Sequence, residues 1–387
     1  MFCRKSFLQF SPPLIGESEI ESVIQTLRSG WITTGPKTSE FESSFANYIC
    51  APTALGLSSC TAGLHIALLA LGIGPGDEVI TTPMTFASTA NVIELVGART
   101  MLVDIEPDTL NIDPIKIEKA INPSTKGIIA VHYAGHPADL DPIRMIAREH
   151  SLSLIEDAAH ALSAIYRGKK IGSNSNPVSF SFYATKNLTT GEGGMLTGKP
   201  EFLKIARIIS HHGMSKDAWK RYNQFGSWYY EVILPGYKYN MTDIQASIGI
   251  QQLLKLDSFQ KRRREIAEKY NSAFKNIDAL SPPIERADVS HAWHLYVIRL
   301  NLSALKIDRN QFIEEMTKRN IGTSLHFIPI HLHPFYRNRY HYAPYDFPIA
   351  FSNYHRVVSL PLNPSMSDKD VTDVIEAVLD IIYQHKR

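Results

Sequence analysis

Lys186 is the residue of this sequence best suited to act as a nucleophile. It lies in the run from Ser179 to Gly194, S-F-S-F-Y-A-T-K-N-L-T-T-G-E-G-G, which contains no second basic residue. Partial burial among apolar side chains favours the neutral lysine amine, which attacks carbonyl groups and forms Schiff bases. The alternative is a surface lysine whose stem packs on Phe182 and Tyr183, and for an isolated lysine this is the commoner case. The neighbouring motifs therefore have to distinguish a nucleophilic lysine from a surface lysine.

Asp157 ends an apolar run of strand length, S-L-S-L-I-E-D-A-A-H from Ser151 to His160. In open α/β sheets ligands bind outside the carboxyl ends of the strands, so a carboxylate at this position points toward a ligand. The alternative is a helix N-cap, since Asp followed by two alanines also starts helices well. On Asp157 alone the two interpretations are equally supported.

The segment from Leu57 to Leu71 predicts a phosphate site. Its sequence, L-S-S-C-T-A-G-L-H-I-A-L-L-A-L, predicts a loop and then an apolar helix, which the glycine-rich G-I-G-P-G at 72–76 ends. Backbone N–H groups at the start of such a helix suit a phosphate, and Ser59 and Thr61 add side-chain donors. An ordinary capped helix has the same pattern, so this signal is weak by itself.

Together these three segments supply what pyridoxal 5′-phosphate requires of a protein: a Schiff-base lysine, an acid beside the ring nitrogen and a phosphate site. An acid beside that nitrogen keeps it protonated, so the ring accepts electrons from a carbanion formed at the substrate carbon. We therefore expect this cofactor, with Lys186 and Asp157 as the catalytic residues.

Four longer motifs resemble the DegT/StrS-type nucleotide-sugar aminotransferases, a family that uses pyridoxal phosphate. They are S-G-W-I-T-T-G-P at 29–36, I-E-D-A-A-H at 155–160, S-F-Y-A-T-K-N at 181–187 and G-Y-K-Y-N-M-T-D-I-Q-A at 236–246. Their order matches the family's, and the resemblance spans nearly the whole chain. It implies an α/β protein with the aspartate aminotransferase-like fold, called fold type I, and a homodimer with shared active sites.

The resemblance also implies the role of each cofactor contact. Lys186 would form the Schiff base, Asp157 would contact the ring nitrogen, and His160 would lie beside the ring hydroxyl. The other implied contacts are Phe86, stacked on the ring, and a phosphate site made of Thr61, the N–H of Ala62, Ser181, and Asn240 from the neighbouring subunit. Related sugar dehydratases have histidine at the position of Lys186, so the lysine favours transamination.

Several of these residues have a structural alternative. Phe86 could be plain core, and His160 could be a satisfied buried histidine. Asn240, in Y-K-Y-N-M-T-D, could cap the helix that begins near Thr242. Two positions depart from the family pattern, with Cys60 where many members carry glycine and Asn176 where aspartate is usual; neither changes a cofactor residue.

The resemblance implies a ping-pong reaction in which L-glutamate gives its amino group to the keto carbon of a nucleotide-linked keto sugar. The motifs S-G-W-I-T-T-G-P and S-S-C-T-A-G-L-H suggest a UDP-4-keto sugar, as in the enzymes that make UDP-4-amino-4-deoxy-L-arabinose. The product would serve lipopolysaccharide, another cell-surface polysaccharide or a secondary-metabolite glycan. GDP-4-keto-6-deoxyhexoses and 3-keto sugars are the alternative substrates.

A histidine-rich segment, H-F-I-P-I-H-L-H-P at 326–334, raises the possibility of a zinc site. No cysteine or paired carboxylate joins the histidines, and Pro329 and Pro334 predict an extended segment, so we expect no metal. The resemblance implies instead that the segment lines the substrate pocket, with His326 and His331 as substrate contacts.

Two other classes of protein are considered. An NAD-dependent nucleotide-sugar oxidoreductase would also have alternating strands and helices, but the fingerprint G-x-G-x-x-G does not follow the first strand. A binding or regulatory protein could keep the fold without catalysis. The presence of Lys186, Asp157 and the phosphate residues argues against it.

Composition indicates a cytoplasmic globular enzyme. The 387 residues are 44% hydrophobic and 20% charged, and the chain is long enough for two domains. A net charge of +2 gives no sign of nucleic acid or a membrane surface as partner. The three cysteines have no metal-binding spacing, the N-terminus lacks the apolar core of a signal peptide, and no apolar run approaches membrane length.

Strand and helix patterns alternate along the first two thirds of the chain, which predicts a mostly parallel sheet covered by helices. Helices are expected at 17–28, after Thr61, from Ser88 and from Pro114, and strands at 78–82, 99–104 and 127–132. The stretch 243–270 predicts one long or kinked helix that links two domains. We expect a large cofactor-binding domain at 1–256 and a small α/β domain at 257–387, with a strand at 293–300 and a helix at 309–319.

Overall fold

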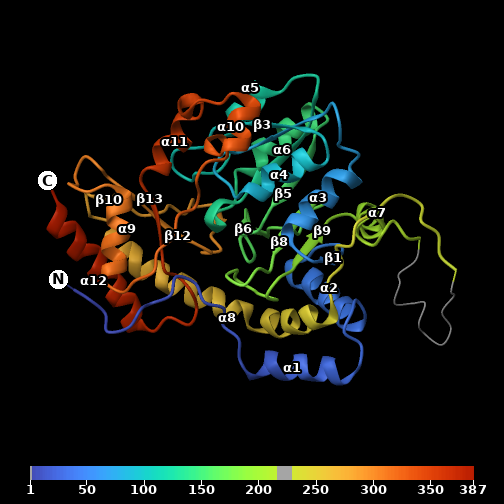
Figure 1. Ribbon diagram of the computed structural model, residues 1–387, viewed down its shortest axis with the longest axis horizontal. Coiled ribbons are helices and arrows are strands. Elements are labelled where there is room, and N and C mark those ends of the chain that lie inside the picture. The colour runs from blue at the N-terminus through green and yellow to red at the C-terminus, as the bar shows by residue number, and fades with distance from the viewer. Residues whose placement is uncertain (1, 216–228) are drawn as a thin grey trace.

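The computed structural model describes residues 2–215 and 229–387, and its largest element is a seven-stranded sheet (Figure 1). The order across the sheet is β1-β9-β8-β5-β4-β2-β3. β9 runs antiparallel to β1 and β8, and all other neighbours are parallel. The strands are β1 (Ala54–Leu57), β2 (Glu78–Thr81), β3 (Arg99–Leu102), β4 (Thr125–Val131), β5 (Ser153–Asp157), β8 (Val178–Ser181) and β9 (Gly194–Thr197). The predicted mostly parallel sheet is thus confirmed.

Both faces of this sheet are buried under helices, because successive strand residues point to opposite faces. Ile129 packs in an apolar cluster with α3, α4 and α7, whereas Ile128 and Ala130 pack in another cluster with α5 and α6. The helices are α3 (Cys60–Ala70), α4 (Ala87–Leu95), α5 (Pro114–Ala120), α6 (Leu140–Glu149) and α7 (Pro200–Ser210). Ligands therefore have access at the strand ends rather than at the faces.

A single helix of 32 residues, α8 (Asp243–Phe274), runs from the large sheet to the C-terminal part of the chain (Figure 1). The prediction of one long helix in this region is confirmed. Two N-terminal helices, α1 (Glu17–Arg28) and α2 (Pro36–Ile49), pack along α8. Its buried residues continue from Ala246 to Phe274, so α8 contributes to the cores at both ends.

The C-terminal part has its own antiparallel sheet, in the order β10-β12-β13, and its own apolar core. Phe274, Tyr296, Phe312 and Val374 are among the fully buried side chains of this core. Its strands and helices are β10 (Leu280–Ser281), β12 (Tyr296–Leu300), β13 (Val357–Leu360), α9 (Arg309–Lys318), α10 (Pro334–Tyr340), α11 (Pro348–Tyr354) and α12 (Asp368–His385). The predicted strand and helix of this region are present, and the strand begins three residues later than expected.

Two features of the structure cross the domain boundary that the sequence predicts. α8 continues through the boundary predicted at 256/257. The N-terminal segment lies against the C-terminal core, since Leu8 pairs with Ile321, and Arg4 forms ion pairs with Asp370 and Asp373. The division into 1–256 and 257–387 stays a prediction.

Shorter elements complete the fold. A small sheet joins β11 (Val289–Ser290), β6 (Ile165–Tyr166) and β7 (Lys169–Lys170), and 3₁₀ turns lie at Tyr133–Gly135, Ile330–Leu332 and Pro344–Asp346. The expectation of an extended segment between Pro329 and Pro334 is wrong: a 3₁₀ turn occupies it, and α10 begins at Pro334, where proline forfeits no helical hydrogen bond. No described helix is both long and apolar enough to span a membrane.

Asp243 fastens the start of α2 to the start of α8. Its carboxylate is 1% exposed and accepts backbone N–H bonds from Gly35 at 2.8 Å, Lys37 at 3.0 Å and Thr38 at 2.9 Å. The Thr38 hydroxyl donates a fourth bond at 2.7 Å. These donors lie at the N-terminus of α2, which has no side-chain cap of its own, so Asp243 acts as its cap from a distance.

Replacing Asp243 with alanine should lower the free energy of unfolding by about 3 kcal/mol, because several buried donors would lose a charged acceptor. Urea denaturation of the purified protein measures this. Asp257→Ala is the matched control on the same helix, since Asp257 is exposed and accepts one bond, from the Tyr48 hydroxyl. It should cost under about 1 kcal/mol. Equal losses in the two variants would show that α2 is held by other contacts.

Candidate active site

A cavity of about 600 Å³ opens at the carboxyl ends of the central strands. β4, β5 and β8 each contribute their last residue to it: Val131, Asp157 and Ser181. The remaining walls are formed by the start of α3, the start of α4, the loop after β5, the loop between β8 and β9, two C-terminal segments, and Phe10 and Ser11 near the N-terminus. Of the residues predicted from the sequence, the cavity brings together Thr61, Phe86, Asp157, His160, Ser181, Lys186 and His326.

Lys186 reaches the cavity from the loop that joins β8 to β9. The loop is closed by backbone hydrogen bonds between Phe182 and Gly193, at 2.9 Å, and from Thr190 to Phe182, also at 2.9 Å. Burial lowers the pKa of the Lys186 amine to about 8, although the charges of Cys60 and Asp157 oppose the shift. A substantial fraction of the amine is therefore neutral near physiological pH, as a nucleophile requires.

Asp157 presents a buried carboxylate at the end of β5, with 4% of its surface exposed. Its Oδ2 accepts from the Thr89 hydroxyl at 2.8 Å, and its Oδ1 accepts from the backbone N–H of Ala159 at 3.1 Å. Burial raises the pKa of Asp157 in spite of these two bonds. A protonated ring nitrogen beside it would stabilise the ionised form, so the residue fits the partner that pyridoxal phosphate requires.

His160 packs against the C-terminal segments, with its ring centroid 4.5 Å from that of His294. Burial holds its pKa well below the ordinary value, and Lys186 and His326 add to the effect, so its imidazole is neutral. The ring stacks on Phe327, with the centroids 5.8 Å apart. Its Nδ1 is buried and has no hydrogen-bond partner in the described structure. A polar atom left unpaired beside the cavity fits a site built for a ligand with polar substituents.

Phe86 is 63% exposed at the start of α4 and lines the cavity, so the alternative that it belongs to the core is wrong. Its ring centroid lies 6.2 Å from that of Phe327. A large apolar ring with one open face suits stacking on a planar cofactor.

The predicted phosphate site lies at the start of α3, and one contact differs from expectation. The Ala62 N–H donates to the Ser59 hydroxyl at 3.0 Å, because Ser59 caps the helix. This N–H is thus engaged, while the Thr61 side chain is exposed on the cavity. A Cβ on Gly194 would lie 2.4 Å from the Ser59 carbonyl carbon, so glycine is needed for β9 to approach this loop.

Two predicted residues have surroundings that the sequence did not indicate. Asn240 does not line the cavity of its own chain, and its amide donates to the Thr34 hydroxyl. It is not the cap of α8, because Thr242 and Gln245 form that capping box. His331 is fully buried, bonds to the Pro344 carbonyl at 3.2 Å and does not reach the cavity.

His326 does line the cavity, and its Nδ1 lies 2.8 Å from the Ser359 hydroxyl. Burial, helped by the charge of Lys186, lowers its pKa to about 3. The imidazole is therefore neutral, and it can exchange hydrogen bonds with a hydroxyl group without carrying charge.

Sequence reasoning missed two side chains that contact the predicted catalytic pair. His294 lies 3.4 Å from the amine of Lys186, and Thr89 bonds to Asp157. The sequence marks His294 only as part of a strand pattern and Thr89 only as part of a helix. Both contacts are tertiary, so no local signal could have revealed them.

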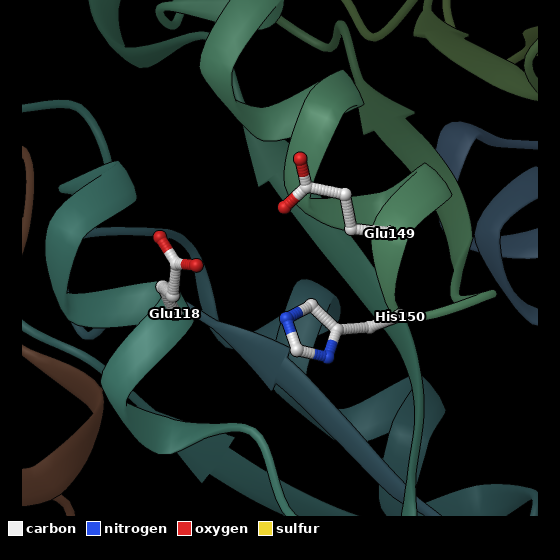
Figure 2. A group of neighbouring side chains, drawn as sticks. All are labelled: Glu118, Glu149 and His150. Atoms are coloured by element: carbon white, nitrogen blue, oxygen red, sulfur yellow. The ribbon is translucent and has the colours of Figure 1, made fainter.

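A separate group of possible metal ligands lies on the surface (Figure 2). Glu118 of α5, Glu149 of α6 and His150 bring ligand atoms within 4.8 Å of one another, and all three are exposed. Exposed acids often gather without an ion, and nothing else at this position points to a ligand, so we assign the group no function. The histidines of segment 326–334 form no such group within the part of the chain that the structure describes.

The strand order, the buried acid and the buried lysine define an enzyme of fold type I that uses pyridoxal phosphate. Residues 13–379 match the model of the DegT/DnrJ/EryC1/StrS aminotransferase family, and the chain belongs to this family. It is a pyridoxal phosphate-dependent sugar aminotransferase. The NAD-dependent and non-catalytic interpretations are therefore wrong.

Two relatives resemble the chain over nearly its whole length. The spore coat polysaccharide biosynthesis protein SpsC of Bacillus subtilis is 53% identical over 382 residues, which cover 98% of each chain. The uncharacterized protein MJ1066 of Methanocaldococcus jannaschii is 56% identical over 384 residues, which cover 99% of this chain and all of that one.

A solved structure agrees. The proposed sugar aminotransferase Spr1654 of Streptococcus pneumoniae, in its pyridoxal phosphate form, is 36% identical with a TM-score of 0.91, covering 98% of this chain and 99% of that one. The pyridoxamine phosphate form of the same protein is 38% identical with a TM-score of 0.92, and the match covers 97% of this chain and 99% of that one.

The rate at which cofactor-free enzyme attaches pyridoxal phosphate covalently should rise with pH and level off above about 9. Only the neutral amine attacks the aldehyde, and the pKa of Lys186 is about 8, so half of the amine is reactive at that pH and most of it one pH unit higher. Borohydride trapping of stopped reactions, with the Lys186 peptide quantified by mass spectrometry, measures the rate. Lys186→Ala is the control and should bind the cofactor without trapping. A rate that continues to climb toward about pH 10, as for a free lysine, would contradict the lowered pKa.

Proposed function

We propose that the enzyme moves the amino group of L-glutamate to the keto carbon of a nucleotide-linked sugar, and that this sugar is a UDP-4-keto sugar. The observation that carries the proposal is the Lys186 amine with a lowered pKa, in one cavity with the buried carboxylate of Asp157. The relatives support the sugar: SpsC is named for polysaccharide biosynthesis, and Spr1654 is a proposed sugar aminotransferase. The product would enter a polysaccharide of the cell surface, and we place the reaction in the cytoplasm.

Five residues of the cavity have a defined task in the proposed reaction. When bound, pyridoxal phosphate supplies a ring that accepts the negative charge left on the substrate carbon after proton removal. Asp157 would keep the ring nitrogen protonated, and Phe86 would offer its ring for stacking. The freed amine of Lys186 would take the proton from Cα of the donor and return it on the cofactor side of the same nitrogen. Thr61 and Ser181 would hold the phosphate.

The wall that Phe10 of the N-terminal segment forms with the C-terminal segments suits a sugar. Phe10 and Phe327 supply apolar surface, and neutral His326 supplies a hydrogen-bonding edge. Phe10 and His326 stack, with centroids 5.8 Å apart. A pyranose ring with its hydroxyls presents complementary apolar faces and polar edges.

The substrate assignment is tested with enzyme loaded with pyridoxamine 5′-phosphate and mixed with single keto sugars linked to UDP, GDP or dTDP. Return of the aldehyde absorbance reports amino transfer. UDP-4-keto sugars should react with the highest kcat/KM, and Lys186→Ala should show no return. Preference for a GDP-linked or 3-keto sugar would contradict only the assignment of a UDP-4-keto sugar. Reaction with simple keto acids alone would contradict a sugar as substrate. The donor is identified in the other half-reaction, in which the pyridoxal form of the enzyme receives an amino group. L-glutamate should react there with a higher kcat/KM than alanine or aspartate.

We also propose that the active form is a homodimer in which Asn240 enters the phosphate site of the partner subunit. Its absence from the cavity of its own chain agrees with this arrangement. Mixing Lys186→Ala subunits with Asn240→Ala subunits would put both defects into one site of a mixed dimer and leave the other intact. Activity absent from either homodimer should then return, provided Asn240→Ala is severely impaired. No recovery after confirmed subunit exchange would contradict the shared site.

A further inference from the structure

His294 is the hydrogen-bonding neighbour of the free Lys186 amine. Its Nε2 lies 3.4 Å from Lys186 Nζ, and the imidazole is 5% exposed. The residue precedes β12, on a segment whose backbone bonds to residues 134–135 after β4. This segment therefore carries a C-terminal side chain into the wall of the cavity.

The surroundings of His294 fix which ring nitrogen carries the proton. The amide nitrogen of Asn187 donates to the Ala292 carbonyl at 2.8 Å, which turns the amide oxygen toward His294. That oxygen lies 3.1 Å from His294 Nδ1 and can only accept, so Nδ1 carries the hydrogen. The lone pair of Nε2 therefore faces Lys186.

His294 is neutral in this position. Burial holds its pKa well below the ordinary value, and the titratable groups that face it, Lys186, His160, Arg263 and His326, add to the shift whenever they are protonated. A neutral imidazole with its lone pair toward the lysine accepts a hydrogen bond from the ammonium and from the amine alike.

We propose that His294 is a positioning residue for the reaction: it accepts an N–H of Lys186 and so aims the lone pair of the free amine at the substrate carbon. An amine has one lone pair, and fixing one N–H direction restricts where that pair points. Without the acceptor the flexible lysine stem samples many orientations, and a misplaced base loses rate steeply. Asn187 acts indirectly, because its amide oxygen accepts from Nδ1 of His294 and so fixes the tautomer of that imidazole. The proposal rests on Lys186 as the proton-moving group.

The test compares His294→Leu, which removes the acceptor, with His294→Gln, which keeps one near the position of Nε2. In the glutamate half-reaction the leucine variant should lose about 10- to 100-fold in rate with little change in KM, and glutamine should restore most of it. His291→Gln is the control. This buried histidine on the same segment stacks on Trp293 at 4.1 Å and does not line the cavity.

A second readout uses cofactor-free protein and is independent of any substrate. Trace acetylation of Lys186 across a pH series, followed by mass spectrometry, gives the pKa of its amine. Loss of an acceptor for the ammonium should lower that pKa by about one unit in His294→Leu and leave it in place in His294→Gln and His291→Gln. An unchanged rate in His294→Leu, or equal defects in the leucine and glutamine variants, overturns the proposal even if the sugar assignment holds.

Asn187→Asp tests the tautomer. A carboxylate at this position stabilises the imidazolium of His294 and raises its pKa, and an imidazolium has no lone pair for Lys186. The rate should therefore fall at low pH and recover as the pH rises through the raised pKa of His294. A uniform loss at every pH would contradict the acceptor role of His294.

Discussion

The site depends on one constraint: a carboxylate and an amine share a cavity that withdraws both from water and gives each only neutral hydrogen-bond partners. Lys186 contacts His294, and Asp157 is bonded to a hydroxyl and a backbone N–H. Burial accordingly lowers the pKa of the amine and raises that of the acid. Such a pair is costly in an ordinary core, but a ligand that brings a carbonyl to the lysine and a cationic nitrogen to the aspartate relieves both costs. The fold therefore holds these groups ready for a cofactor that completes their interactions.

Glu156, the neighbour of Asp157 in β5, shows that the lack of a charged partner is particular to Asp157 and not common to the buried acids of this strand. Alternation along the strand turns Glu156 to the opposite face, where it is also fully buried. There, the hydrogen bond and charge of His132, with Arg144 and Asn176, outweigh burial and lower its pKa. Asn174 and Asn176 both donate to Glu156 Oε1, at 3.0 and 3.2 Å, so the loop that departs from the family pattern is tied to this carboxylate. The pKa values of the two adjacent acids are therefore shifted in opposite directions. Only Asp157, at the end of the strand, lacks a charged hydrogen-bond partner and is available to a ligand.

Much of this arrangement could be predicted from the sequence, because the informative signals are local. Apolar runs and glycine stops locate the strands, helix starts and the acid at the end of β5, and the aromatic and glycine-rich run around Lys186 marks the nucleophile. The rest depends on contacts between distant segments. Ser59 takes the Ala62 N–H because the helix start needs a cap, and His331 is buried by α10 and the turn before α11 rather than exposed to substrate. No spacing in the sequence encodes that His294 reaches Lys186, since the two are 108 residues apart.

The amine of Lys186 contacts the C-terminal part, whereas the carboxylate of Asp157 is held within the large sheet and by α4. Asp157 is fixed by its strand and by α4, whereas His294 belongs to the segment that leads into β12. The fully buried Arg263 of α8 fastens this segment, donating to the Trp293 carbonyl at 3.3 Å and to the Leu362 carbonyl at 2.8 Å. A displacement of the C-terminal part would therefore carry the acceptor away from Lys186 and leave Asp157 in place. The wall that includes His326 and Phe327 would move with it, so the seating of a sugar and the aim of the lysine depend on the same contact between the two parts of the chain.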